Sequence, residues 1–389
     1  MRIVDIKERS VAISRYADPL LPSGGLTTSL VAIVTDVIRH GKPIIGYGFA
    51  SMGRFAQGGL IRERFAPRLL AAGEADLIDN AGANLDPFRA WRIMMSGEKP
   101  GGHGERCVAV GTLDMALWDA ASKIANEPLH RHLSKRGGGS GVSNPSVSVY
   151  AGGGYYYPAQ DMARLSDEVH RFRDLGYRRV KIKVGGAKLP QDLKRIDAAA
   201  RAIGGFEHVA VDAMYSYSAV SSIEAVDRLA PLGLWWFEDI CDPLDFETVK
   251  MVAERYSGPI AAGEALFSTA EAKLLDRYGG LRRNQDILLF DPVHCYGVPG
   301  YLQIIELMES RGWPRSAFWP HGGHLFCLHL VAAFGLAGAE VNPLCFPPFG
   351  GYAHGSIISE GVAIPPEVPG IGFEAKRDLL PLLATLRAG

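Results

Sequence analysis

The chain has 389 residues, a formal net charge of −1, 47% hydrophobic residues and 21% charged residues, which is the composition of an ordinary globular protein. This length predicts two or three domains, or one small domain and a barrel. The balanced charge argues against nucleic acid or an anionic membrane surface as partners, and no apolar run approaches the roughly 18–20 residues that span a bilayer.

The N-terminal end and the cysteines both favour a cytoplasmic protein. Residues 1–7 alternate apolar and polar side chains like a strand and contain no apolar signal-peptide core. The cysteines are odd in number and contain no CxxC pair, which predicts reduced, buried thiols. They are Cys107, Cys241, Cys295, Cys327 and Cys345.

The first part of the chain predicts a small α+β domain over residues 1–130. Residues 29–37 and 44–49 are apolar, β-rich segments joined by a turn, so we expect antiparallel strands. Helical spacing runs over residues 57–98, and a further helix is expected over 108–125. The glycine-rich stretch at 136–145 then predicts a linker and a domain boundary.

From residue 147 onward, short apolar strands alternate with helical stretches. The last residues of these strands recur every 26 to 30 positions, which predicts parallel strand–helix units closing into a TIM-like barrel over residues 146–354. An open, doubly wound parallel sheet is the alternative. The expected strands are 147–150, 180–184, 209–212, 234–238, 260–264, 287–291, 317–321 and 339–341.

An ionisable residue stands at the carboxyl end of six successive predicted strands. In a barrel of this kind the active site lies at that end of the strands. A single acidic residue there is more often a helix cap or a solvated loop charge, but six in a row favour a common site. They are Lys183, Asp212, Glu238, Glu264, Asp291 and His321.

These residue types predict proton abstraction next to a carboxylate. Three carboxylates, Asp212, Glu238 and Glu264, share a small site only when a cation neutralises them, and all-oxygen ligation favours Mg²⁺. Lys183 and His321 would face the bound substrate as acid and base. Asp291 would orient His321. Lys181 lies two positions from Lys183 on the same strand face, and we expect this proximity to lower the pKa of at least one lysine.

The ordered set Lys-x-Lys, Asp, Glu, Glu, Asp, His resembles the enolase superfamily, specifically its mandelate racemase subgroup. The stretches 98–106 (EKPGGHGER), 151–158 (AGGGYYYP), 320–324 (PHGGH) and 369–374 (PGIGFE) are similar to those of D-tartrate dehydratases and related acid-sugar dehydratases. The resemblance covers essentially the whole chain.

The resemblance implies an α/β fold, a (β/α)7β barrel with an α+β capping domain built from the N-terminus and the C-terminal tail, residues 355–389. The cap loops at 17–25 and 49–58 would close over the site. It implies that Asp212, Glu238 and Glu264 bind Mg²⁺, with Lys183 and His321–Asp291 as catalytic groups. It also implies a homo-oligomer that acts on a small hydroxy-carboxylate. The expected substrate-binding residues are Lys181, Lys99, Glu340 and Tyr156; for Lys99 and Tyr156 a loop or packing role is the alternative.

The expected reaction is dehydration of a hydroxy acid or acid sugar, tartrate-like, to a 2-keto acid. Met214 replaces the asparagine usual after Asp212 in such dehydratases, and residues 19–22 and 50–52 of the cap are apolar. We therefore expect a less polar or differently shaped substrate than D-tartrate. A racemase or epimerase that uses the same lysine and histidine is one alternative, and a non-catalytic barrel is another.

Overall fold

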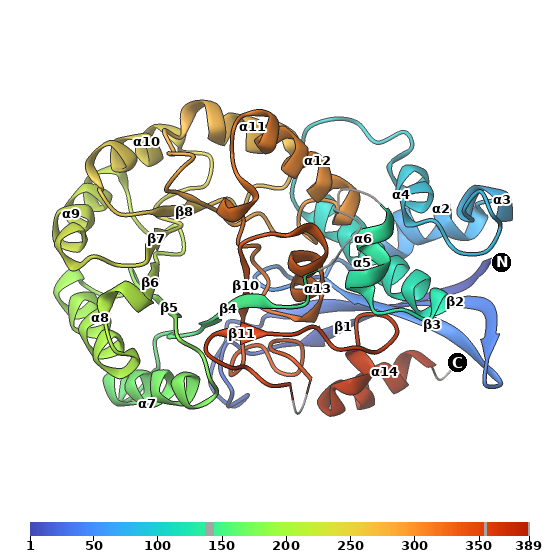
Figure 1. Cartoon of the computed structure of the whole chain (residues 1–389), viewed down its shortest axis with the longest axis horizontal. Helices are drawn as coiled ribbons and strands as arrows, with labels where there is room; N and C mark the ends of the chain where they lie inside the picture. The colour runs from blue at the N-terminus through green and yellow to red at the C-terminus, as the bar shows by residue number, and fades with distance from the viewer. Residues whose placement is uncertain (137–143, 354–355, 388–389) are drawn as a thin grey trace.

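The N-terminal part of the chain forms a three-stranded antiparallel sheet covered by helices (Figure 1). The computed structural model describes residues 1–136, 144–353 and 356–387. The sheet has the order β1-β2-β3, and α5 packs across β2 and β3. The contact with α5 requires glycine at Gly46, where an added Cβ would lie 2.0 Å from Ala116 O. The elements are β1 (Ile3–Ala12), β2 (Thr27–Arg39), β3 (Lys42–Phe49), α1 (Gly58–Leu60), α2 (Ala66–Ala71), α3 (Glu74–Leu77), α4 (Pro87–Met95), α5 (Glu105–Ala125) and α6 (Leu129–Arg136).

The next part of the chain forms parallel strands that curl into a ring, with helices around the outside (Figure 1). Strand β10 pairs in parallel with β4, which places the last strand beside the first and excludes the open doubly wound sheet. The predicted capped barrel is therefore confirmed. The strands are β4 (Val147–Gly152), β5 (Val180–Lys183), β6 (Val209–Asp212), β7 (Trp236–Glu238), β8 (Ile260–Ala262), β9 (Ile287–Leu288) and β10 (Gly338–Val341). The helices are α7 (Asp161–Asp174), α8 (Leu189–Ile203), α9 (Ala219–Leu229), α10 (Phe246–Arg255), α11 (Thr269–Tyr278), α12 (Gly297–Ser310) and α13 (Leu325–Phe334).

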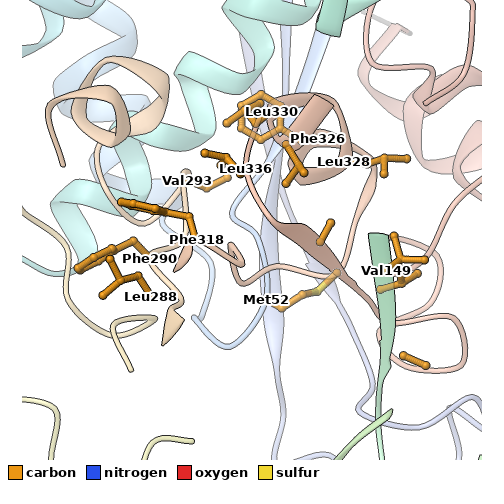
Figure 2. Packing of buried hydrophobic residues seen from close by; sticks show 14 of the residues in the cluster. Met52, Val149, Leu288, Phe290, Val293, Phe318, Phe326, Leu328, Leu330 and Leu336 are labelled. Atoms are coloured by element: carbon orange, nitrogen blue, oxygen red, sulfur yellow. The ribbon is translucent and has the colours of Figure 1, made fainter. Parts of the chain in front are cut away.

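The strand predicted at 317–321 is reduced to a single bridge between Phe318 and Leu288. Pro320 has no backbone N–H, so a regular ladder cannot continue through it. The segment still completes the ring, because Trp319 N donates to Leu288 O at 2.9 Å and Ala337 N donates to Phe318 O at 3.1 Å. Figure 2 shows Phe318 beside Leu288 in the buried apolar cluster.

The C-terminal segment contacts both the barrel and the cap. Strand β11 (Val362–Ala363) pairs antiparallel with β4, and α14 (Leu380–Arg387) packs against β1 and β2. Between them, the buried Lys376 ammonium donates to three carbonyl oxygens, those of Phe349 (3.2 Å), Gly350 (2.6 Å) and Gly351 (3.0 Å). Lys376 therefore holds the loop that follows β10.

We expect Lys376→Met to lower the free energy of unfolding by about 3 kcal/mol, because methionine fills the space but leaves three carbonyl oxygens without their donor. Urea unfolding followed by circular dichroism measures the change. Lys273→Met, at an exposed lysine of α11, is the matched control and should change stability by less than about 0.5 kcal/mol. Equal stability of the two variants would contradict this role of Lys376.

Other sequence predictions have mixed outcomes. All five cysteines are buried and free of disulfides, as predicted. The helical spacing at 57–98 corresponds to several short helices rather than to long ones. Most of the predicted linker at 136–145 lies outside the described residues. Among the described residues, no helix has the length and apolar character needed to cross a membrane.

Candidate active site

The interior of the barrel is built in layers, and the lowest layer at the site is apolar. Side chains of alternate strand residues point into a barrel, so the residue two positions further along each strand lies one layer higher. This rule places Asp212 above Ala210, Glu238 above Trp236, and His321 above Trp319. The apolar floor consists of Tyr150, Ala210, Trp236, Ala261, Leu289 and Trp319.

Asp212, Glu238 and Glu264 converge above this floor. Each offers a carboxylate oxygen, and these three atoms lie within 4.8 Å of one another. Asp212 and Glu238 are fully buried. Trp236 Nε1 donates to Glu238 Oε2 at 2.7 Å and orients that carboxylate, whereas Glu264 Oε2 is buried and accepts no hydrogen bond. An all-oxygen donor set with one unbonded oxygen fits a hard divalent cation such as Mg²⁺.

The two lysines of β5 lie on the same interior face, as predicted from their spacing. Lys181 Nζ lies 2.6 Å from Glu238 Oε1 and 3.1 Å from Glu340 Oε1, and Lys183 is paired with Asp212. Burial alone would lower the pKa of each lysine. The carboxylates outweigh it: Glu238 and Glu340 raise the pKa of Lys181, and Asp212 raises that of Lys183, above the usual lysine value. The predicted lowering is therefore wrong, because neighbouring carboxylates outnumber the two ammonium groups.

His321 is held by Asp291, as predicted. His321 Nδ1 donates to Asp291 Oδ2 at 2.9 Å, so Nε2 is directed toward Glu264, whose Oε2 lies 3.6 Å away. Burial lowers the pKa of His321, but Glu264 and Asp291 more than compensate and raise it to about 9. These contacts fix the tautomer and the orientation of the ring.

A residue of the cap completes this arrangement. Ser51 is fully buried and its hydroxyl donates to Asp291 Oδ2 at 2.6 Å. The same hydroxyl oxygen lies 3.0 Å from His324 Nε2, which assigns His324 the role of donor. Ser51 therefore connects the loop after β3 to the pair of Asp291 and His321.

Above the carboxylates lies a cavity of about 50 Å³. Lys183 and His321 both line it, from different sides of the ring. Glu264 and Glu340 also reach it, and the remaining walls come from the cap loop, the loop after β4, the loop after β6 and the loop after β10. The lining residues are Met52, Gly53, Gly153, Tyr155, Lys183, Met214, Glu264, His321, Glu340, Asn342 and Phe346.

The sequence from residue 164 to 379 matches the family described as Enolase C-terminal domain-like, which is more than half of the chain. The chain belongs to the enolase superfamily. The predicted resemblance is thereby confirmed.

Several curated relatives of this chain are acid-sugar enzymes. The arabinonate dehydratase of Saccharolobus solfataricus is 27% identical over 70% of this chain and 71% of its own length. The L-talarate/galactarate dehydratase of Salmonella typhimurium is 28% identical over 79% of this chain and 71% of its own length. Among solved structures, a racemase from Streptomyces coelicolor with bound magnesium has a TM-score of 0.73 at 22% identity, covering 95% of this chain and 96% of that one. At this identity the structural match establishes the enolase-superfamily fold alone.

Not all of the predicted substrate-binding residues line the cavity. Glu340 lines it, whereas Lys181 lies beneath, paired with carboxylates. Tyr156 is directed away: its hydroxyl bonds Asp192 and accepts from Gly186 N at 3.0 Å. The preceding residue, Tyr155, lines the cavity instead. Lys99 is exposed on its loop and does not line the cavity.

Sequence reasoning missed Ser51 and Asn342, and it chose Tyr156 instead of the adjacent Tyr155. For Asn342 there was a signal, because it lies two positions after Glu340 and so points to the same face of the barrel. Asn342 is held against Gly323, where an added Cβ would lie 2.0 Å from Asn342 Nδ2. For Ser51 the sequence contains no signal, because its partner Asp291 lies 240 positions away.

A buried carboxyl group behind the cavity makes stability depend on pH. Burial raises the pKa of Glu168 from its usual 4.5 to about 7, although Gly154 N donates to it at 3.2 Å. The folded state therefore binds the Glu168 proton more tightly than the unfolded state does. Its stabilising effect is complete below about pH 4.5 and is lost as the pH rises to about 7.

We expect Glu168→Gln to gain about 3 kcal/mol of stability relative to the wild type between pH 4.5 and pH 7.5. Urea unfolding at the two pH values measures this difference. Asp167→Asn, the neighbouring exposed carboxylate, should show no such change. A constant difference between wild type and Glu168→Gln across the pH range would contradict the raised pKa.

A larger cavity of about 870 Å³ lies elsewhere, between the cap and the C-terminal segment. Its walls include Arg39, Tyr47, Lys123 and Arg387. None of the carboxylates of the candidate metal group reaches it, so size alone does not indicate the site of chemistry here.

Proposed function

We propose that this chain is a Mg²⁺-dependent dehydratase of a hydroxy acid or acid sugar. The observation that carries the proposal is that Lys183, His321 and Glu264 line the same cavity. The similarity to the arabinonate and L-talarate/galactarate dehydratases supports it. Further support comes from the solved structure of L-talarate dehydratase from Polaromonas sp. JS666, complexed with Mg and L-glucarate, which is 24% identical with a TM-score of 0.68.

Asp212, Glu238 and Glu264 would hold the ion. Bound there, Mg²⁺ would stabilise the negative charge that develops on the substrate carboxylate. Among the charges near Lys183, Asp212 raises its pKa most, and Asp212 is itself one of the ligands. Its charge is therefore shared with the cation once the ion is bound.

Proton transfer belongs to Lys183 and His321. One of them removes the α-proton, and the electron pair of the C–H bond forms the C=C bond of an enol as the β C–O bond breaks. Protonated His321 donates from Nε2 to the departing hydroxyl, which leaves as water. The enol then tautomerises to a 2-keto acid. Because the two side chains approach from different sides, the configuration at C2 decides which one takes the first proton.

Racemisation or epimerisation is the second candidate. The same two groups, Lys183 and His321, would remove and return the α-proton on different faces. A curated relative, the hydrophobic dipeptide epimerase of Enterococcus faecalis, is 24% identical over 80% of this chain and 80% of its own length. No hydroxyl needs to leave in this reaction.

Proton NMR in D₂O with Mg²⁺ separates the two candidates. We expect a 2-keto acid to appear when the protein meets its hydroxy-acid substrate. Exchange of the α-proton without a keto product would instead establish the racemase. Neither exchange nor product with any of a panel of hydroxy acids and acid sugars, while Mg²⁺ binds, would contradict both.

Assembly and compartment remain predictions. We expect a homo-oligomer in the cytoplasm. Light scattering coupled to size-exclusion chromatography tests the first, and fractionation of the source cells tests the second.

A further inference from the structure

The cavity above the carboxylates is small. Its volume is about 50 Å³, whereas one water molecule requires roughly 10–15 Å³ measured in this way. The space therefore corresponds to about four water positions. This small size favours a compact substrate over an extended chain with a hydroxyl group on every carbon.

The walls away from the reacting groups are apolar. Met52 of the cap loop and Phe346 of the loop after β10 are buried, and both belong to the main apolar cluster. Figure 2 shows Met52 among the residues of this cluster. The ring of Tyr155 packs edge-on against Phe346, with centroids 5.9 Å apart. The end of the substrate that projects toward the cap therefore meets carbon and sulfur atoms.

Met214 forms part of the same cavity wall in a backbone conformation that disfavours it. Its φ is +46°, a region in which asparagine and glycine are favoured over long side chains. Strained backbone conformations of this kind cluster at active sites and ligand-binding positions. The long thioether side chain then occupies space where asparagine would offer an amide.

Few polar groups are left for distal hydroxyls. Lys183 and His321 act on the reacting carbons, and Glu264 would hold the metal ion. Glu340 is already bonded through both oxygens, by Lys181 at 3.1 Å and by Gly322 N at 3.3 Å. Asn342 is the remaining neutral polar side chain apart from the Tyr155 hydroxyl among the residues that line the cavity. A substrate with several distal hydroxyls would bury most of them without a partner, which is costly.

We propose that Met52, Met214 and Phe346 select a compact 2,3-dihydroxy acid whose distal end is a short alkyl group. The inference rests on the proposed dehydratase function. The C3 hydroxyl and the C2 proton leave together as one water molecule. The alkyl group is retained in the 2-keto acid product. We expect the apolar walls to disfavour extended, polyhydroxylated acids.

Paired substrates test this selection. The wild-type protein with Mg²⁺ is assayed for 2-keto acid with 2,3-dihydroxybutanoate, with each tartrate isomer and with galactarate. We expect kcat/KM for the methyl-terminated acid to exceed the others by about 100-fold or more. Met52→Ser and Met214→Asn should each shift that ratio toward tartrate by about 10-fold or more. Met52→Leu, which keeps the wall apolar, should retain the wild-type preference.

The outcomes separate this inference from the function on which it rests. Equal or higher kcat/KM with tartrate or galactarate would overturn the selection while the dehydratase stands. Ratios that Met52→Ser and Met214→Asn leave unchanged would overturn the role of these walls. α-Proton exchange in D₂O is measured with the same acids, and absence of both exchange and keto product with all of them would overturn the dehydratase and the selection together.

Discussion

Replacing His321 with asparagine is expected to lower turnover by about 1,000-fold or more, within the range of general acid–base catalysis. Asparagine can still accept and donate hydrogen bonds, but it cannot exchange a proton at the position of Nε2. The same loss is expected for Lys183→Met, which removes the other group that lines the cavity. Steady-state formation of 2-keto acid and α-proton exchange in D₂O measure the effect.

Two further variants provide comparisons for this loss. Ser51→Ala removes only the hydroxyl that bonds Asp291 Oδ2 at 2.6 Å, so we expect a smaller loss, about 10-fold, with kcat affected more than KM. His170→Asn, on α7 outside the barrel, should leave turnover unchanged. Turnover by His321→Asn within about 10-fold of the wild type would show that His321 is not the acid or base.

Removal of the metal is expected to abolish turnover, and Asp212→Asn is expected to weaken Mg²⁺ binding by more than about 100-fold. Even the outer hydrogen-bond partners of a metal site typically change affinity by about 10- to 100-fold, and Asp212 would be a direct ligand. Isothermal titration calorimetry with Mg²⁺ alone measures the affinity. Chelation with EDTA followed by addition of Mg²⁺ should abolish and then restore activity.

Asp286→Asn is the matched control for the metal site. Asp286 is also a buried carboxylate, but it lies before β9, where it accepts from Ile260 N at 2.8 Å and pairs with Arg282 at 2.7 Å. We expect this variant to lose stability and to keep the Mg²⁺ affinity of the wild type. Mg²⁺ binding by Asp212→Asn at wild-type affinity would contradict the assignment of the three carboxylates.

The barrel and the candidate reacting groups were predictable because both depend on local periodicities. Strand–helix units of near-constant length place every strand end at one face of the barrel, so Asp212, Glu238 and Glu264 could be assigned to one site before their distances were known. The period of two along a strand likewise placed Lys181 and Lys183 on one face. The segment at 317–321 ends in the predicted His321 even though Pro320 prevents a regular strand there.

The electrostatics of the site were not predictable in the same way. A pKa depends on the sum of burial and all nearby charges, and these come from several strands. The two lysines alone suggest a lowered pKa, whereas their actual neighbours, Asp212, Glu238 and Glu340, raise it. Which of two adjacent tyrosines reaches the cavity was also beyond the sequence, because the loop after β4 directs Tyr156 to Asp192 and leaves Tyr155 at the site.

The sequence by itself therefore determined the class of fold, the order of the reacting residues and the cation that their carboxylates favour, because these follow from the period of each element and from side-chain chemistry. Only the tertiary structure decided which side chains cover the site. Ser51 and Met52 reach the barrel from a cap loop, across more than 200 positions of sequence. Such contacts depend on how separate elements pack, and local sequence patterns contain no record of that packing.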